Sequence, residues 1–168
     1  MTSHDMPVAP EPLLTNTDGR QSQRAIEIAR GTQRLLAGYG FRTLAEVTLA
    51  NWRRADVMAI GEKGEIWIIE IKSSIEDFRA DQKWPEYRDY CDRLFFAVAP
   101  SFPNEILPAD AGLIIADRYG GEILRPAPEH KLAGARRKAM TLRLVHTAAF
   151  RLQAAIDPEG RFEEPFNL

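Results

Sequence analysis

Apolar and polar positions recur along the chain with two different periods, which predict helices and strands. Residues 22–40 carry apolar residues at helical spacing, Ser22 is a suitable N-cap, and Gly38 and Gly40 end the helix. The apolar stripe of this first helix is expected to consist of Ile26, Ala29, Gln33, Leu36 and Ala37.

Three strands are expected to follow the first helix. Residues 41–50 alternate between apolar and polar side chains, residues 54–60 are short and apolar, and residues 65–74 are rich in β-branched residues. Gly61–Gly64 has the composition of a hairpin turn, so the second and third strands should be neighbours in the sheet.

A second helix and two central strands come next. Residues 74–91 have a helical pattern that Pro85 interrupts, because proline is not tolerated inside a helix. Residues 93–100 and 112–117 are unbroken apolar runs, which are typical of buried strands in a parallel or mixed sheet.

The last elements are a short strand and a long helix. Residues 120–128 can add a strand only at a sheet edge, since Pro126 and Pro128 cannot occupy a central strand. The predicted order of the main elements is α-β-β-β-α-β-β-α, an α/β domain with a mixed β-sheet flanked by helices. The final helix, over residues 133–156, has on one face Leu142, Val145, Ala149 and Leu152.

Length and composition indicate one domain. With 168 residues, 45% of them hydrophobic, the chain can bury a single core over residues 21–156, with tails at 1–20 and 157–168. Its apolar runs stay below the roughly 20 residues that span a bilayer. The first residues also lack the pattern of a signal peptide. A cytoplasmic protein without a membrane partner is therefore expected.

The charge distribution is more informative than the net charge of −2. Carboxylates dominate residues 62–92, whereas the segment from Lys131 to Arg151 contains six basic residues and no acidic one. This contrast suits an enzyme that holds cations and a polyanion together, although a solvated helix face explains the basic segment as well. The single cysteine, Cys91, excludes an intrachain disulfide and a cysteine-based zinc site, and it is expected to be a buried structural thiol.

Three charged residues interrupt otherwise apolar strands. Asp56 lies in the second predicted strand, and Glu70 and Lys72 lie in the third. Side chains alternate along a strand, so Glu70 and Lys72 share one face while Ile71 points to the other face and into the core. Asp56 and Glu70 are six and seven residues from the centre of the hairpin turn, so they should be nearly opposite. Burying charge is costly unless the charges are paired or bind a metal.

Two carboxylates and an ammonium on one sheet face suit metal-dependent hydrolysis of a phosphodiester. Asp56, Glu70 and the carbonyl of Ile71 offer hard oxygen ligands for Mg²⁺ or Mn²⁺, and Lys72 can stabilise the charge that builds on phosphate. Lys72 can alternatively help to deprotonate the attacking water. The structural alternative is a buried ion pair between Lys72 and one of the carboxylates. The sequence contains no GxxxxGK, GxGxxG or GxSxG pattern, so nucleotide-binding and hydrolase-elbow functions lack support.

The pattern Asp56 with Glu70-Ile71-Lys72 at the end of the next strand, between two helices, resembles the PD-(D/E)XK nuclease superfamily, with Ala55 in place of the loosely kept proline. The stretch from Arg53 to Pro100 resembles the MmcB-like family of bacterial proteins, regarded as DNA-repair endonucleases, and the likeness extends over residues 22–155. This resemblance implies a restriction-endonuclease-like core and the cleavage of DNA.

The resemblance also implies further site residues. An acidic residue on the first helix often completes the metal site in this superfamily, and Glu27 has that position, with Glu46 on the first strand as the alternative. Gln82 and Tyr87 resemble a Gln and Tyr pair on the helix that follows the ExK strand. Their spacing is one residue longer than usual and Pro85 intervenes.

Several polar residues near the motif are candidates for binding phosphate. Arg53 and Arg54 precede Asp56 and would lie at the mouth of the site, although a solvated strand end explains them nearly as well. Ser73 directly follows the motif and can either contact phosphate or cap the next helix. The aromatic residues Trp84, Tyr87 and Tyr90 can stack on bases or belong to the core.

The sequence therefore favours a Mg²⁺- or Mn²⁺-dependent deoxyribonuclease that acts in DNA repair. The alternative is a non-catalytic module that keeps the nuclease fold and binds DNA or a repair or replication protein. An RNA substrate stays open, because the fold and the metal site do not distinguish the sugar. A homodimer acting on duplex DNA is an expectation that rests on the resemblance alone.

Overall fold

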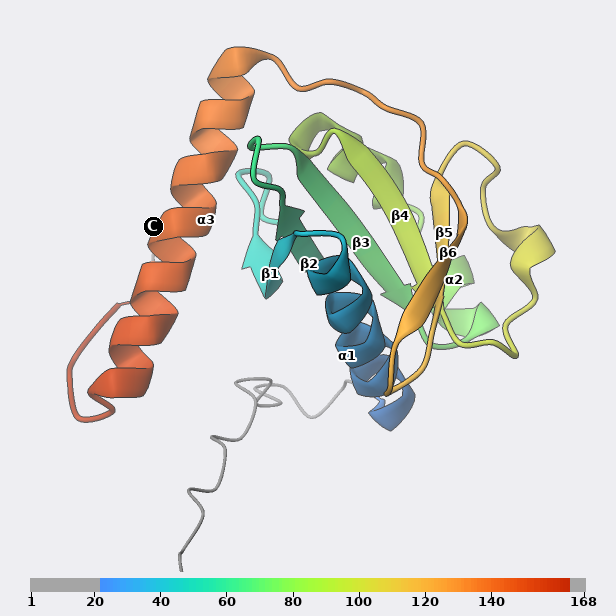
Figure 1. Cartoon of the computed structure of the whole chain (residues 1–168), viewed down its shortest axis with the longest axis horizontal. Coiled ribbons are helices and arrows are strands. Elements are labelled where there is room, and N and C mark those ends of the chain that lie inside the picture. Colours follow the sequence, from blue (N-terminus) through green and yellow to red (C-terminus); the bar gives the residue numbers. More distant parts are fainter. Residues whose placement is uncertain (1–21, 164–168) are drawn as a thin grey trace, which may run out of the picture.

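A computed structural model describes residues 22–163 as an α/β domain built on one sheet (Figure 1). The whole predicted tail 1–20, residue 21 and the end of the tail 157–168 from residue 164 onwards lie outside the described residues. None of the helices in the described range is long and apolar enough to cross a bilayer. The elements in chain order are α1 Gln23–Gly38, β1 Arg42–Thr48, β2 Arg54–Ile60, β3 Ile66–Lys72, α2 Ile75–Ala80, the 3-10 helix η1 Trp84–Tyr90, β4 Arg93–Val98, the 3-10 helix η2 Asn104–Ile106, β5 Gly112–Ala116, β6 Gly121–Arg125 and α3 Gly134–Ile156.

The six strands of the sheet follow one another in chain order from β1 to β6. Strands β1, β2 and β3 pair antiparallel, β3, β4 and β5 pair parallel, and β6 returns antiparallel to β5. The predicted mixed sheet flanked by helices is confirmed, and it is consistent with a restriction-endonuclease-like core. Strand β6 lies at the sheet edge, as Pro126 and Pro128 predicted.

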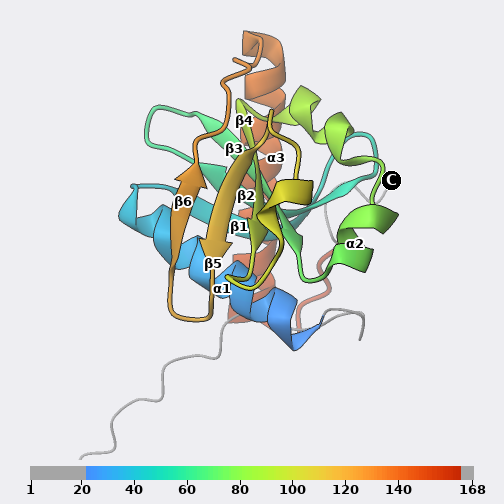
Figure 2. The same cartoon turned by 90° about the vertical axis from the view of Figure 1, so that its right-hand side faces the viewer.

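Helix α1 packs on one face of the sheet and contacts every one of the six strands (Figures 1 and 2). The predicted N-cap is confirmed, because Ser22 Oγ accepts a hydrogen bond from the Ala25 N–H at 3.1 Å. The predicted stripe is only partly right, because Ile26, Gln33 and Ala37 lie outside the buried face. The buried positions of the helix are Ala25, Ile28, Ala29, Gly31, Thr32 and Leu36.

Gly31 explains why the buried face of α1 differs from the predicted stripe. A Cβ atom at this position would lie 1.8 Å from the carbonyl oxygen of Asp117, in the turn between β5 and β6. The helix backbone therefore touches the turn directly. Apolar spacing alone missed this contact, because glycine contributes little to a hydrophobic pattern.

The expected helix over 74–91 consists of two short pieces, α2 and the 3-10 helix η1. Pro85 lies in the first turn of η1, where its missing N–H costs nothing. Tyr87 and Tyr90 are buried, and Trp84 packs edge-on against Phe96 with the ring centroids 5.3 Å apart. These aromatic residues belong to the core. Cys91 is also buried, as predicted.

Helix α3 lies beside the edge strand β1, apart from the layer formed by α1 (Figure 1). In this fully described helix the buried residues are Met140, Leu144 and Thr147. Arg143 donates a 3.0 Å hydrogen bond to the Thr48 carbonyl, and Arg151 donates to the carbonyls of Ala45 and Glu46. These contacts cover backbone groups of β1 that an edge strand would otherwise leave exposed.

A buried ion pair anchors the start of α3. Asp92, which is 2% exposed, accepts hydrogen bonds from the backbone N–H groups of Ile66 and Leu132 at 2.7 and 2.9 Å. Both oxygens of this carboxylate also accept from Arg137, at 2.6 and 2.7 Å. Because all four donors converge on one side chain, Asp92 connects β3, the segment before α3 and α3 itself.

Candidate functional site

The register of the β2–β3 hairpin places Asp56 beside Glu70. Val57 pairs with Ile69, so Asp56 and Glu70 form the next step along the two strands. The Asp56 N–H donates to Glu70 Oε1 at 3.3 Å, and the Ile71 N–H donates to Asp56 Oδ2 at 2.8 Å. The prediction that the two carboxylates are nearly opposite is confirmed.

Strand alternation also sorts the residues of β3 as predicted. Ile69 and Ile71 belong to the core cluster that includes α1, whereas Ile68 belongs to the cluster on the other side of the sheet. Glu70 and Lys72 share the face of Ile68, and they are 3% and 4% exposed. The Lys72 ammonium donates to Asp81 Oδ2 at 2.7 Å. The lysine is therefore paired with a residue beyond the motif.

A polar hollow of about 400 Å³ lies over these side chains. It is formed at the carboxyl end of β3, where α2 contacts the strand (Figure 1), together with the first turn of α1 and the start of β2. The lining residues are Ser22, Ala25, Arg54, Asp56, Glu70, Ile71, Lys72, Ser73, Asp77 and Tyr87. Carboxylates, an ammonium and hydroxyls therefore face one shared space.

The ionised forms of the Asp56 and Glu70 carboxyl groups are unfavourable in this buried environment. Burial raises the pKa of Asp56 from its ordinary value to about 6, against the hydrogen bond from Ile71 and the charge of Lys72, which lower it. Burial and the neighbouring Asp56 carboxylate raise the pKa of Glu70 well above its usual range. Bringing a cation to this pair would offset the cost of ionising both groups.

Unlike the two carboxylates, the Lys72 ammonium is stabilised in its charged form. Burial by itself would lower the pKa of this lysine, but the hydrogen bond and charge of Asp81, together with the charge of Glu70, raise it above its ordinary value. Lys72 is therefore a positively charged group at neutral pH. Tyr87 donates its hydroxyl to the Arg54 carbonyl at 3.0 Å, and burial raises its pKa as well, so it remains a neutral donor.

The structure brings some of the other predicted residues to the hollow. Arg54 and Tyr87 line it, and the exposed guanidinium of Arg54 lies 3.8 Å from a carboxylate oxygen of Glu46. The negative charge of Glu46 contributes to the raised pKa of Asp56. Ser73 also lines the hollow, but the residue that caps α2 is Ser74, whose Oγ accepts from the Asp77 N–H at 3.1 Å.

Three predicted residues lie outside the lining of the hollow. Glu27 accepts a hydrogen bond from Gln23 one helical turn away, at 3.2 Å. Arg53 pairs with Glu86 at 3.1 Å, and the Gln82 amide donates to the Arg79 carbonyl at 2.8 Å. Gln82 lies on the exposed segment after α2, outside the hollow that Tyr87 lines.

Asp77 and Asp81 are the site residues that sequence reasoning missed. Asp77 lies in the first turn of α2, and its carboxylate accepts from the Ser73 N–H at 3.1 Å. The Asp77 N–H in turn donates to Ser74 Oγ, so Asp77 belongs to the capped first turn of α2 that the sequence S-x-x-D signals. Asp81 carries no such signal, because its role depends on how the segment after α2 turns back to Lys72.

Comparison with known proteins assigns the family. A family described as DNA repair protein MmcB-like matches residues 13–159 of the 168-residue chain. The chain belongs to the MmcB-like family. It is also similar to the solved structure of SPO1766, a protein of unknown function from Silicibacter pomeroyi, with 52% identity and a TM-score of 0.81 over 84% of this chain and 97% of that chain. No curated protein matches the chain. Membership of the MmcB-like family indicates a role in DNA repair.

The donor set of this MmcB-like chain suits a hard divalent cation. Within residues 22–163, no group of three Asp, Glu, His or Cys side chains is placed to hold a metal ion. The available ligands are the carboxylates of Asp56 and Glu70 and the carbonyl of Ile71. Such a partial oxygen shell fits Mg²⁺ or Mn²⁺, because Mg²⁺ sites usually keep waters and substrate phosphate oxygens in the remaining positions.

The basic segment of the MmcB-like chain, from Lys131 to Arg151, has a largely structural use. Arg137 pairs with Asp92, while Arg143 and Arg151 donate to carbonyls of β1. Arg136 lies over the Tyr90 ring, 5.0 Å from its centroid. The contrast of charge along the sequence therefore reflects mainly how α3 is attached to the sheet.

Proposed function

We propose that this chain hydrolyses phosphodiester bonds in DNA with the aid of Mg²⁺ or Mn²⁺, as an endonuclease of the PD-(D/E)XK type that acts in repair. The observation that carries the proposal is the convergence of Asp56, Glu70 and Lys72 on one sheet face under an open polar hollow. The DNA repair family supports DNA as the nucleic acid. The mixed sheet supports the superfamily.

The carboxylates have the role of binding the cation. Asp56 and Glu70 would hold Mg²⁺ or Mn²⁺ together with the carbonyl of Ile71, and a bound cation would favour the ionised form of both groups. Once bound, the cation supplies activation of water and neutralisation of phosphate charge. The backbone hydrogen bonds that Asp56 and Glu70 accept fix each carboxylate before any ligand arrives.

Lys72 is assigned to transition-state stabilisation. Its raised pKa keeps the ammonium charged, so it would donate hydrogen bonds to the negative charge that builds on the scissile phosphate. A charged lysine cannot accept a proton, which disfavours the general-base role. Asp81 holds the ammonium in place without facing the hollow as a lining residue.

Arg54 and Ser73 are assigned to the substrate. Both line the hollow, and the Arg54 side chain is more than half exposed at its rim, where it can reach a flanking phosphate. Contacts of this kind position the backbone without reading the base sequence. The site is therefore expected to recognise the shape of the DNA, such as a flap, a junction or a single strand.

The proposal is tested by an activity panel. Wild-type protein, Asp56→Asn and Lys72→Met are incubated with nicked, flap, junction and single-stranded DNA in the presence of Mn²⁺ or Mg²⁺. Wild-type protein should cleave at least one substrate, and each variant should lose about 10²- to 10³-fold in rate. The exposed turn residue Lys63 supplies the matched control, and Lys63→Met should cleave normally.

Two results would reject the proposal. One is equal cleavage by wild-type protein and by both variants that still fold, because the activity would then come from a contaminant. The other is DNA binding without cleavage that is indifferent to EDTA and to Lys72→Met. That result would favour a non-catalytic module that keeps the nuclease fold. Circular dichroism of each variant distinguishes loss of chemistry from loss of folding.

A further inference from the structure

Helix α3 carries a line of apolar side chains on its outward face. Four of them are large and exposed, Leu142 at 50%, Val145 at 57%, Leu152 at 60% and Ile156 at 76%, and the small Ala149 between them is exposed as well. These five residues are called the α3 seam. A contiguous exposed apolar line of this kind is a feature of interaction sites.

The spacing of the α3 seam is that of a coiled coil. Successive members are separated by three, four, three and four residues, which is the a and d pattern of a heptad repeat. This line is additional to the face that α3 turns towards its own domain, where Met140, Leu144 and Thr147 are buried. The domain therefore buries one face of α3 and leaves a second apolar face exposed.

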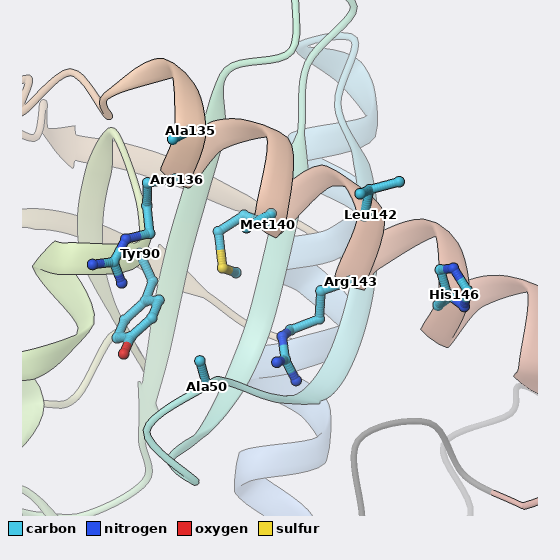
Figure 3. Close-up of a pocket in the computed structure, with 9 residues that line it drawn as sticks. Ala50, Tyr90, Ala135, Arg136, Met140, Leu142, Arg143 and His146 are labelled. Carbon is cyan, nitrogen blue, oxygen red and sulfur yellow. The ribbon is translucent and has the colours of Figure 1, made fainter.

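The close-up of α3 shows the two sides of the helix. Met140 lies between the helix and the strands, whereas Leu142 points away from Met140 (Figure 3). A groove of about 590 Å³ runs beside Leu142, between α3, Tyr90 and the loop at Ala50. A second groove, of about 800 Å³, has Leu152 in its lining, beside α1 and β1. Two members of the seam, Leu142 and Leu152, therefore each line a groove.

Charge along α3 and beyond it favours one kind of partner. The helix contains five basic residues and no acidic one, and three of the basic residues stand together at Arg136–Lys138. The exposed segment 157–163 that follows carries three acidic residues and one basic residue, namely Asp157, Glu159, Glu163 and Arg161. The two ends of this region therefore have opposite charge.

We propose that two copies of the chain pair through the α3 seam in antiparallel orientation, with the twofold axis near Ala149. Leu142 and Val145 of one copy then face Ile156 and Leu152 of its partner. The basic start of each helix lies beside the acidic segment 157–163 of the other copy. A parallel pair would instead place Arg136 and Lys138 against their own duplicates, while Arg137 is neutralised by Asp92. The small side chain at Ala149 allows the helices to approach closely at the axis.

Such a pair uses the same patch on both copies, which is the interface type of twofold dimers. The pairing buries the α3 seam, which is exposed to water in the isolated domain. The inference does not depend on the proposed nuclease activity, because none of the seam residues lines the polar hollow.

Oligomeric state is the first test. The mass of the full chain is measured by light scattering and by sedimentation, from roughly 1 to 200 μM, a range that includes the dissociation constants of weak dimers. The 19.0 kDa chain should show twice its own mass at the higher concentrations. Leu152→Asp should restore the single mass. The neighbouring exposed residue gives the matched control, and Gln153→Asp should leave the dimer intact.

Disulfide trapping tests the orientation. Because Cys91 is buried, a cysteine on the surface of α3 is the reactive one. In an antiparallel pair with its axis near residue 149, Ala149→Cys should cross-link under mild oxidation. Lys138→Cys should not cross-link, because the two copies of residue 138 would be about 33 Å apart along the helices. A parallel pair would cross-link at both positions and would overturn the proposed orientation.

Three further outcomes would overturn the pairing itself. The first is a single mass for the wild-type chain at every concentration, and the second is a dimer that Leu152→Asp does not affect. The third concerns the end of the chain. If protein shortened after Glu163 forms a dimer while the full chain stays single, residues 164–168 occupy the seam in place of a second copy. Unchanged circular dichroism of Leu152→Asp ensures that lost pairing does not reflect lost folding.

Discussion

Lys72 and Asp81 form a 2.7 Å ion pair in which the lysine is almost completely buried and the aspartate is partly exposed. Nine residues separate them, and the short helix α2 lies between them in the sequence. The pair holds the ammonium on the face of Glu70 and keeps it charged. Asp81 therefore acts through Lys72 and is a positioning residue.

Asp81→Asn is expected to lower kcat by about 10- to 100-fold and to change KM little, because it weakens the hold on Lys72 and leaves the hollow in place. Steady-state kinetics on the best DNA substrate measure both constants. Asp89→Asn, at an exposed position of η1, is the matched control and should behave like wild type. An unchanged kcat in folded Asp81→Asn protein would contradict the positioning role.

The carboxylate pair is expected to destabilise the protein when no cation is bound. Because the folded-state pKa of Asp56 is raised from 3.8 to about 6, the ionised group disfavours the native state at pH 7. Stability should therefore rise as the pH falls from about 6 towards 4. Asp56→Asn should raise the free energy of unfolding at pH 7 by about 1 to 3 kcal/mol. Urea unfolding at both pH values measures these changes, and a loss of stability in the variant would contradict the prediction.

Divalent cations should stabilise the same site. A cation that binds the folded protein alone adds about 2.7 kcal/mol to the free energy of unfolding at one hundred times its dissociation constant. Mn²⁺ and Mg²⁺ should therefore raise the Tm of wild-type protein, and EDTA should reverse the change. The double variant Asp56→Asn, Glu70→Gln should show no shift in Tm. An equal shift in both proteins would place the cation elsewhere.

The buried pair of Asp92 and Arg137 is expected to be a structural requirement. Asp92→Ala leaves the Arg137 guanidinium and two backbone N–H groups without their acceptor, and should lower the free energy of unfolding by about 3 to 5 kcal/mol. Asp110→Ala is the control, because its pair with Arg88 is exposed and should contribute less than about 1 kcal/mol. Similar losses in both variants would contradict this assignment.

The Asp92–Arg137 pair also predicts how the stability of the protein changes at acid pH. Although burial opposes it, hydrogen bonding to Arg137 and to backbone N–H groups lowers the pKa of Asp92. Its stabilising contribution is therefore complete above the unfolded pKa of about 4 and is lost as the pH falls through the lower folded value. The free energies of unfolding of wild-type and Asp92→Asn protein should converge in this acid range. A difference between them that does not change with pH would contradict the assignment.

Two glycines of α1 form a matched test of how closely the helix packs. Gly31→Ala would place Cβ 1.8 Å from the Asp117 carbonyl oxygen and should lower the free energy of unfolding by about 1 to 3 kcal/mol or more. Gly38→Ala meets nothing within 4 Å and should be neutral or slightly stabilising. Thermal or urea unfolding compares the two, and equal effects would show that the contact at Gly31 can relax.

Much of the fold follows from local patterns. Residues close together in the sequence are enough to predict the N-cap at Ser22, the turn at Gly61–Gly64, the strands and the edge position of β6. The predicted stripe of α1 was less accurate, because its packing depends on Gly31 meeting a turn some 90 residues later, at Asp117. The predicted interruption of the helix over 74–91 near Pro85 is confirmed, since α2 ends at Ala80 and η1 begins at Trp84.

The residues of the candidate site likewise include some that local sequence predicts and others that depend on tertiary packing. Asp56, Glu70 and Lys72 could be named from the sequence, because alternation and hairpin geometry place these charges on one face of two neighbouring apolar strands. Glu27 and Gln82 were named by resemblance, and Arg53 by its position before Asp56. Their side chains bond to Gln23, the Arg79 carbonyl and Glu86 respectively. Asp81 could not be named, since nothing local links it to Lys72.

The sequence by itself determined which strands pair at the hairpin and which charges share a sheet face, because these relations follow from a period of two and a count from one turn. The tertiary structure alone decided which carboxylate holds Lys72 and which arginine meets Asp92. It also decided that the apolar line on α3 faces outward. These relations join residues far apart in the chain, and they depend on how whole elements pack, which no local pattern encodes.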